Sequence, residues 1–351
     1  MAMNRLSRRG SLDRDVIRDI DGQIWTVLGH IQPKDRVIAF LKYIPAKGGR
    51  WSRDDAQYDR IFWGGAQSVT EGMGQISSKY LHDDPHFGTV LPSVPIAHIA
   101  RHYMPEARLK EIAELGARDI LEERALRLAE ILSDSTGIDL ASFGVAGSLV
   151  WRAHDLSYSD INMCVYGFDE SWRLQDAYEQ ISEDNARVSL REETDWLAAK
   201  SRIVSRVPTL NMEDLHPLFA RRRGLCLDGQ CIGVTPVLRA HEAPILYLTE
   251  RYEDISSDPI RTTFDVHDAS YGLFLPSLYH GESGELDEID GERASRLMIY
   301  EGAFRGLVRV EDRLEVTATL QRVMRPSGEA TLYQLMVGTM TGAGREYISL
   351  L

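Results

Sequence analysis

The chain has 351 residues, of which 43% are hydrophobic and 26% are charged, and its formal net charge is -13. This length permits two or three domains that each bury a hydrophobic core, and the composition is ordinary for a soluble globular protein. The acidic excess argues against sequence-independent binding of nucleic acid over an extended surface, because such binding needs many Lys and Arg side chains to displace counterions. A small nucleotide that arrives with a metal ion is easier to accommodate on such a protein.

The cysteine pattern argues against a structural zinc site. Cys164, Cys226 and Cys231 form no Cys-x-x-Cys pair and have no histidine cluster nearby. Cys164 lies in an apolar segment and is predicted to be a buried thiol. Few cysteines, no signal peptide and no apolar run of about 20 residues predict a soluble protein of the reducing cytoplasm, without a membrane partner.

The first part of the chain predicts a tail followed by a small α+β module. Residues 1–15 are polar and basic without periodicity, so we expect a flexible tail, with a nucleic-acid arm as the alternative. Within residues 16–105, segments 23–31 and 36–44 are rich in β-branched and aromatic residues. The turn at residues 33–35 between them predicts an antiparallel hairpin. Further strands are expected at 58–63 and 87–91, and a helix at 68–80.

Four histidines of this module are scattered through polar loops. We interpret them as solvated or hydrogen-bonded surface residues, with a metal site as the alternative. They are His82, His86, His98 and His102.

Residues 106–242 are expected to form an α/β core that begins with a helix over 106–136. Asp119 is a suitable N-cap with Glu122 three residues later, and Gly137 is a suitable stop. Further helices are expected at 169–183, 191–204 and 211–222, and strands at 224–228 and 231–238.

The most informative segment is 143–166. It is typical of a short buried strand, a Gly147-Ser148 step that opens a helix, a polar loop and a second strand. Alternation on that second strand places Asp160 and Asn162 on one face, with the apolar residues on the other. A helix N-terminus offers N–H groups to phosphates, and Asp and Asn offer oxygen ligands to Mg²⁺ or Mn²⁺. The segment therefore predicts a nucleotide phosphate site.

Gly147-Ser148 and the later run Ser-Asp-Ile-Asn-Met-Cys-Val-Tyr at 159–166 resemble the signature of the polymerase-β-type nucleotidyltransferase superfamily. That signature is a hydrophobic-Gly-(Gly/Ser) turn, a connection, and a strand with the pattern Asp-hydrophobic-(Asp/Glu)-hydrophobic. The specific resemblance covers residues 118–238. The whole chain also looks similar to archaeal proteins that set such a domain between an N-terminal module and a C-terminal β domain.

The resemblance implies roles for the matching residues. Gly147-Ser148 would bind the triphosphate, and Asp160 would be the first metal ligand. Asn162 stands where the family has a second carboxylate, and a neutral carbonyl attracts a divalent cation less strongly. The family usually supplies a third carboxylate from a later strand, as base toward the attacking hydroxyl. The strand expected at 231–238 has none, and Asp228 just before it is the tentative candidate.

The basic run 221–223 has two interpretations. Arg221 and Arg222 are tentative contacts to a triphosphate or to nucleic acid. The alternative is a solvated helix end whose positive charge complements the helix dipole.

Residues 243–351 predict an all-β domain of the OB-like barrel type, because short strand-like runs alternate there with turns. Three aromatic residues, Tyr271, Phe274 and Tyr279, are interpreted either as a stacking surface for single-stranded RNA or as core. The strand-like runs are 245–248, 261–266, 272–275, 296–309, 313–325 and 331–339.

Together these features predict an α/β and α+β multidomain protein with a nucleotidyltransferase-like core, an N-terminal α+β module and a C-terminal β-barrel-like domain. The expected activity is metal-dependent transfer of a nucleoside monophosphate from an NTP to an acceptor hydroxyl, with Mg²⁺ or Mn²⁺ as cofactor. The alternative is a catalytically degenerate nucleotide- or RNA-binding protein that keeps the same fold.

Overall fold

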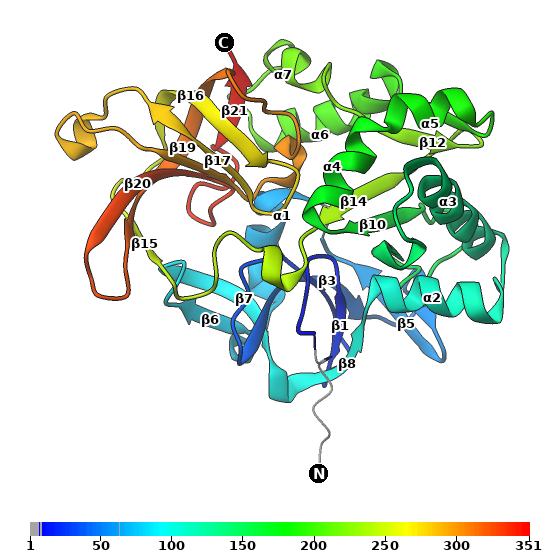
Figure 1. Ribbon diagram of the computed structural model, residues 1–351. Coiled ribbons are helices and arrows are strands. Elements are labelled where there is room, and N and C mark those ends of the chain that lie inside the picture. Colours follow the sequence, from blue (N-terminus) through cyan, green and yellow to red (C-terminus); the bar gives the residue numbers. More distant parts are fainter. Residues whose placement is uncertain (1–6, 8, 63) are drawn as a thin grey trace.

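The computed structural model describes residue 7, residues 9–62 and residues 64–351. These residues form four β-sheets. Figure 1 shows three lobes, with the N-terminal module in blue and cyan at the bottom, a green helical core on the right, and a yellow to red β-barrel on the left. None of the described helices combines the length and apolar character that crossing a bilayer requires.

The N-terminal sheet has the strand order β4-β5-β3-β2-β1-β8, with β7 also paired to β3 and β6 to β7. The expected hairpin is confirmed, since β2 and β3 pair antiparallel with Thr26 opposite Phe40. The sheet curls because β3 pairs with β2, β5 and β7 along its length. The strands are β1 (Val16–Asp19), β2 (Ile24–Val27), β3 (Arg36–Pro45), β4 (Trp51–Arg53), β5 (Ala56–Arg60), β6 (Leu81–Asp84), β7 (Thr89–Pro95) and β8 (Ile99–Tyr103).

Two expectations for this module need correction. The helix expected at 68–80 is shorter and earlier, at α1 (Gly65–Gly72), and short 3-10 turns follow it. The tail expected at 1–15 is packed where it is described, because Asp15 is completely buried. Arg9 compensates this buried charge with paired bonds of 2.8 Å to Asp15 and a bond of 2.6 Å to Glu106.

The histidines divide into two pairs. His86 and His102 are buried, so the surface interpretation is wrong for them. His102 Nε2 lies 2.8 Å from Asp15 Oδ2, which adds a second partner for the buried carboxylate. His82 and His98 are partly exposed, as expected.

The helix expected at 106–136 is two helices, α2 (Pro105–Leu115) and α3 (Ile120–Thr136). The chain turns between them at Gly116, where φ is +84°. Asp119 caps α3 as expected, accepting bonds from two backbone N–H groups, and Gly137 ends it at φ +67°. Glu122 does not close a capping box: its Oε2 accepts a bond of 3.0 Å from Arg118 N, one residue before the N-cap, and its Oε1 pairs with Arg108.

The core sheet contains β9 (Phe143–Val145), β10 (Asn162–Tyr166) and β14 (Gly233–Val237). β10 lies in the middle, antiparallel to β9 and parallel to β14. Apolar residues of β10 and of α3 share one hydrophobic cluster, which fixes the sheet against the helix. The remaining elements of this lobe are α4 (Phe168–Asp176), α5 (Tyr178–Asp184), β11 (Val188–Leu190), β12 (Leu225–Leu227) and β13 (Gln230–Cys231).

Two helices that precede the barrel in the chain pack on it. They are α6 (Leu197–Arg206) and α7 (Met212–Phe219). Their apolar residues Ile203 and Leu215 belong to the same buried cluster as Leu335 of the barrel. The apolar stripe of each helix therefore helps to cover the barrel.

The C-terminal lobe contains a closed barrel, because β16-β17-β18-β20-β19 form a ring in which β19 pairs back with β16. Alternate residues of β19, from Leu314 through Val316 to Ala318, point into its core. The runs expected as strands at 245–248 and 272–275 are not strands. The strands are β15 (Arg251–Asp254), β16 (Ile260–Tyr271), β17 (Ser277–Ser283), β18 (Arg296–Ile299), β19 (Arg313–Met324), β20 (Ala330–Val337) and β21 (Tyr347–Leu350).

Candidate functional site

The Gly147-Ser148 step does not open a helix. Residues 147–152 form consecutive turns, and the loop is closed by a bond from Ala153 N to Ser148 O at 3.0 Å. Gly147 has φ +66°, a conformation outside the helical region. The buried Ser148 hydroxyl donates to Ser159 Oγ at 3.2 Å. The expected helix N-terminus is therefore absent from this part of the described chain, and the serine hydroxyl is already used inside the loop.

Asn162 stands at the centre of the candidate site, as the first residue of β10. Its backbone carbonyl accepts a bond of 2.7 Å from Ala146 N, which holds the end of β9 beside it. A Cβ added at Gly147 would lie 3.5 Å from Asn162 Nδ2, and one added at Gly233 would lie 2.6 Å from Asn162 Oδ1. The half-buried amide is thus flanked by two residues without side chains.

Asp160 lies before the strand and is exposed, while Ile161 between it and Asn162 is fully buried. Among the described residues, the clusters of three or more possible metal ligands do not include Asp160. Asp160 is therefore an exposed carboxylate at the edge of the site, outside any such cluster.

Arg191 is a site residue that the sequence did not suggest. Its guanidinium Nη2 donates to Ile232 O at 3.0 Å, directly beside Gly233, and its Nε is buried without a hydrogen-bond partner among the described residues. Burial lowers the pKa of Arg191, and the negative charges of Asp195 and Asp160 oppose that shift. A lone arginine after a three-residue strand carries no sequence signal that would have revealed this position.

The two clusters of possible metal ligands are already engaged. In the first, Asp119 caps α3 and lies 2.8 Å from His154 Nε2, while Glu122 pairs with Arg108. The second consists of Asp195, Cys226 and Cys231. Its two cysteines are opposite each other in β12 and β13 and form a disulfide, which the sequence did not lead us to expect.

Cys164 is a buried free thiol, as expected, and burial raises its pKa. It lies on the same side of β10 as Asn162 and packs in one cluster with Leu12 and Tyr166. The packed N-terminal segment therefore covers that side of the strand beyond its first residue. The open part of the site is limited to the start of β10.

The three tentative residues are held by partners elsewhere in the fold. Asp228 forms the turn between β12 and β13 and pairs with Arg187 at 2.6 Å. Arg221 forms an ion pair of 2.6 Å with Asp312, which directly precedes the barrel strand β19. Arg222 donates to the backbone carbonyl of residue 303 at 2.7 Å, and burial lowers its pKa to about 10. The structure therefore gives each of them a structural partner.

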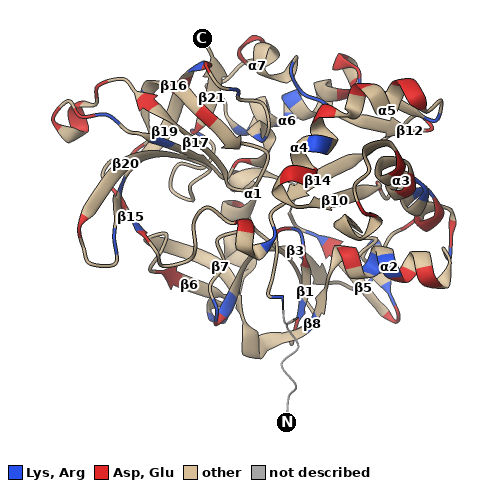
Figure 2. Cartoon of the chain, in the orientation of Figure 1, with Lys and Arg blue, Asp and Glu red and all other residues tan. Residues whose placement is uncertain are grey.

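The aromatic residues of the barrel are core rather than an exposed stacking surface. Phe274 and Tyr279 are buried. Tyr271 packs against Phe168 of α4, with ring centroids 5.1 Å apart. Figure 2 shows acidic and basic residues interspersed along α2 and α3, a pattern unlike a continuous phosphate-binding stripe.

Comparison with known proteins gives one relative. The chain is 25% identical over 348 residues to an uncharacterized protein, MJ1086, of Methanocaldococcus jannaschii, and the match covers 96% of this chain and 98% of the relative. No protein-family model matches the chain. No solved structure matches it either.

Proposed function

We propose that the β9-β10-β14 lobe is a nucleotide-binding module that has lost two-metal nucleotidyl transfer. The observation that carries this proposal is the register between β10 and β14, in which Asn162 stands opposite Gly233. The resemblance to nucleotidyltransferases calls for carboxylates on both of these strands. In this chain β10 carries the neutral amide of Asn162 at that position, and β14 carries Gly233, which has no side chain.

The donor set does not fit a pair of divalent ions. Two-metal sites are built from several carboxylate oxygens, because hard cations need negative oxygen ligands. Asp160 belongs to none of the clusters of three or more possible metal ligands among the described residues, and the negative charges of Asp160 and Asp195 both act on Arg191. A bound nucleotide would therefore have to bring its own Mg²⁺ or Mn²⁺, and Asp160 would be a single contact to that ion.

The glycines and the arginine support a binding role. Gly147 and Gly233 leave the surface beside Asn162 free of side chains, so that a phosphate chain can approach the backbone there. Arg191 supplies a partly buried guanidinium with an unused N–H, a group suited to phosphate oxygens. Transfer to an acceptor hydroxyl lacks the base that the nucleotidyltransferase mechanism needs, which favours binding over catalysis.

The test is calorimetric titration of each NTP, with and without Mg²⁺ or Mn²⁺, into the wild-type protein and into three variants. Asp160→Ala and Arg191→Gln should each weaken binding about tenfold or more, since each removes a charged contact. Asp134→Ala, which changes an exposed carboxylate of α3, is the matched control and should bind like the wild type.

Turnover separates the two candidate activities. Labelled NTP should yield no transferred nucleotide with the wild type, whereas Asn162→Asp should strengthen metal-dependent binding because it restores a charge. Absence of NTP binding would refute the proposal. Metal-dependent release of pyrophosphate by the wild type that Asp160→Ala abolishes would show instead that the site is an active nucleotidyltransferase.

A further inference from the structure

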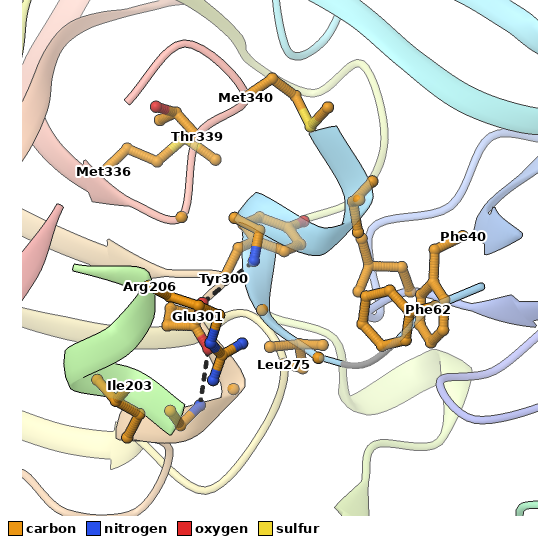
Figure 3. Close-up of a pocket in the computed structure, with 18 of the residues that line it drawn as sticks. Phe40, Phe62, Ile203, Arg206, Leu275, Tyr300, Glu301, Met336, Thr339 and Met340 are labelled. Carbon is orange, nitrogen blue, oxygen red and sulfur yellow. Dashed lines mark hydrogen bonds between the residues drawn. The ribbon is translucent and has the colours of Figure 1, made fainter. Parts of the chain in front are cut away.

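A cavity of about 330 Å³ lies where the N-terminal module, α6 and the barrel meet. Its wall combines residues from segments far apart in the chain, among them Phe40 of β3, Ile203 of α6 and Met336 of β20 (Figure 3). Ligand cavities in proteins have volumes of about 300 to 1,000 Å³, so this space is large enough for a small organic molecule. Its wall includes Arg222, whose guanidinium is held by the backbone carbonyl of residue 303, but not Gly147, Asp160, Asn162, Arg191 or Gly233.

Most of the wall is apolar. The rings of Phe40 and Phe62 lie with their centroids 4.0 Å apart on one side. Leu275, Ile203 and Met336 are buried residues of the remaining wall. An apolar wall of this kind gains from contact with an apolar guest, because the guest's apolar surface leaves water when it binds.

The wall also carries polar atoms that lack partners within the described chain. Arg206 Nη1 and Tyr300 Oη are both buried without a hydrogen-bond partner. Both groups can donate a hydrogen bond. Burial raises the pKa of Tyr300 well above its ordinary value, so its hydroxyl keeps its proton. Buried polar groups are nearly always paired in folded proteins, so two unpaired donors on a cavity wall indicate a missing acceptor.

The two carboxylates on the same wall each accept hydrogen bonds from the protein. Glu301 accepts bonds from Ala66 N at 3.1 Å and from Ala303 N at 3.3 Å, as Figure 3 shows. Asp254 accepts a bond of 2.8 Å from Gln321. Four arginines and these two carboxylates make up the charged residues of the wall. The arginines are Arg14, Arg202, Arg206 and Arg222.

Arg206 is fixed in a position to receive an anion. Its Nε donates to the backbone carbonyl of Arg202 at 3.0 Å. A Cβ added at Gly65 would lie 2.0 Å from Arg206 Nη1, so the guanidinium packs directly on a glycine at the start of α1. The same Cβ would lie 2.7 Å from Glu301 Oε2, so a carboxylate is close to the guanidinium, but Arg206 Nη1 has no hydrogen-bond partner within the described residues.

We propose that this cavity binds a small carboxylic acid with an apolar chain or ring, whose carboxylate accepts bonds from Arg206 and Tyr300. The apolar body would lie against Phe40, Phe62 and Met336. A carboxylate suits the site better than a phosphate dianion, since the two unpaired donors match its two oxygens and its single charge. None of the residues proposed to bind the nucleotide lines this cavity.

The experiment compares octanoate with 1-octanol, which has the same chain without the charge, by isothermal titration into the full-length protein. Octanoate should bind at least about tenfold more tightly, the effect of a hydrogen bond to a charged group. Arg206→Met should remove that preference and leave octanol binding nearly unchanged. Arg127→Met, at an exposed arginine of α3, is the matched control and should keep the preference.

A second variant covers the case in which Arg206→Met does not fold. Tyr300→Phe removes only the unpaired hydroxyl and should weaken octanoate more than octanol. The proposal is overturned if octanoate does not bind, if both compounds bind equally to the wild type, or if the folded Arg206→Met protein keeps the preference for octanoate. ATP that displaces octanoate competitively would show that the two ligands share one site, and would also contradict the proposal.

Discussion

Glu346 offers the sharpest test of how the barrel supports the cavity wall. This carboxylate is 4% exposed and has no cation among its bonded partners. One oxygen accepts bonds from Thr319 N at 3.0 Å and from the hydroxyls of Thr319 and Thr339 at 2.6 and 2.8 Å. The other accepts bonds of 2.7 Å from the N–H groups of Gly338 and Thr339. Glu346 therefore ties a loop of the cavity wall to strand β19.

The cost of changing Glu346 follows from the donors that it leaves unpaired. In Glu346→Gln one carboxylate oxygen becomes an NH₂ group, which cannot accept a hydrogen bond and faces at least one backbone N–H. The threonine hydroxyls can rotate and accept a bond from the new NH₂ group, but a backbone N–H cannot. One unsatisfied buried N–H lowers the free energy of unfolding by about 1–3 kcal/mol. Glu346→Leu leaves three backbone N–H groups without an acceptor, so we expect a loss of at least about 3 kcal/mol.

Calorimetric unfolding at about pH 8 measures these differences, because burial raises the pKa of this carboxyl and a high pH keeps it charged. Hydrogen exchange at the amides of residues 319, 338 and 339 provides a local readout. The control is Glu329→Gln in the β19–β20 hairpin, where the side chain is 67% exposed and its ion pair with Arg325 contributes little. If Glu346→Gln is as stable as this control and its amide exchange is unchanged, the reasoning is refuted.

Three further predictions test other parts of the structure. Burial lowers the pKa of His30 to about 4. Between pH 6.5 and pH 4 the unfolded chain therefore binds a proton at His30 that the folded chain does not bind, so the free energy of unfolding falls as the pH drops through this range. In urea unfolding, His30→Leu should remove about 2 kcal/mol of the stability loss between pH 7 and pH 5, and an unchanged pH dependence would contradict this. Gly144→Ala would place a Cβ 2.6 Å from the backbone of α2, so it should cost at least about 2 kcal/mol in thermal unfolding. Gly137→Ala meets open space and carries only the cost of its left-handed backbone at φ +67°, so it should lose only about 1 kcal/mol. Arg221→Gln breaks the ion pair with the nearly buried Asp312, so it should destabilise the protein by about 1–3 kcal/mol and leave the NTP affinity unchanged. A tenfold loss of NTP affinity would instead show that Arg221 contacts the nucleotide.

Local signals in the sequence determined several elements correctly. The N-cap Asp119 and the stop at Gly137 were predictable because both act within one helical turn. The β2–β3 hairpin and the buried thiol Cys164 followed from residue type and alternation. The closed barrel was anticipated from its short strands, although two of the expected runs proved to be turns. For the helix cap, the helix stop and the buried thiol, the signal and the structure lie within a few residues of each other.

The candidate site depended on contacts that no local pattern contains. Only the pairing of β10 with β14, two strands about seventy residues apart in the chain, puts Gly233 opposite Asn162 and so removes the position for another carboxylate. The cavity likewise exists because α1, α6 and the barrel pack together, which buries Arg206 Nη1 and Tyr300 Oη without hydrogen-bond partners among the described residues. A sequence motif specifies which chemical groups are present, whereas packing between distant segments decides which of them meet, which are already bonded and which remain free to bind a ligand.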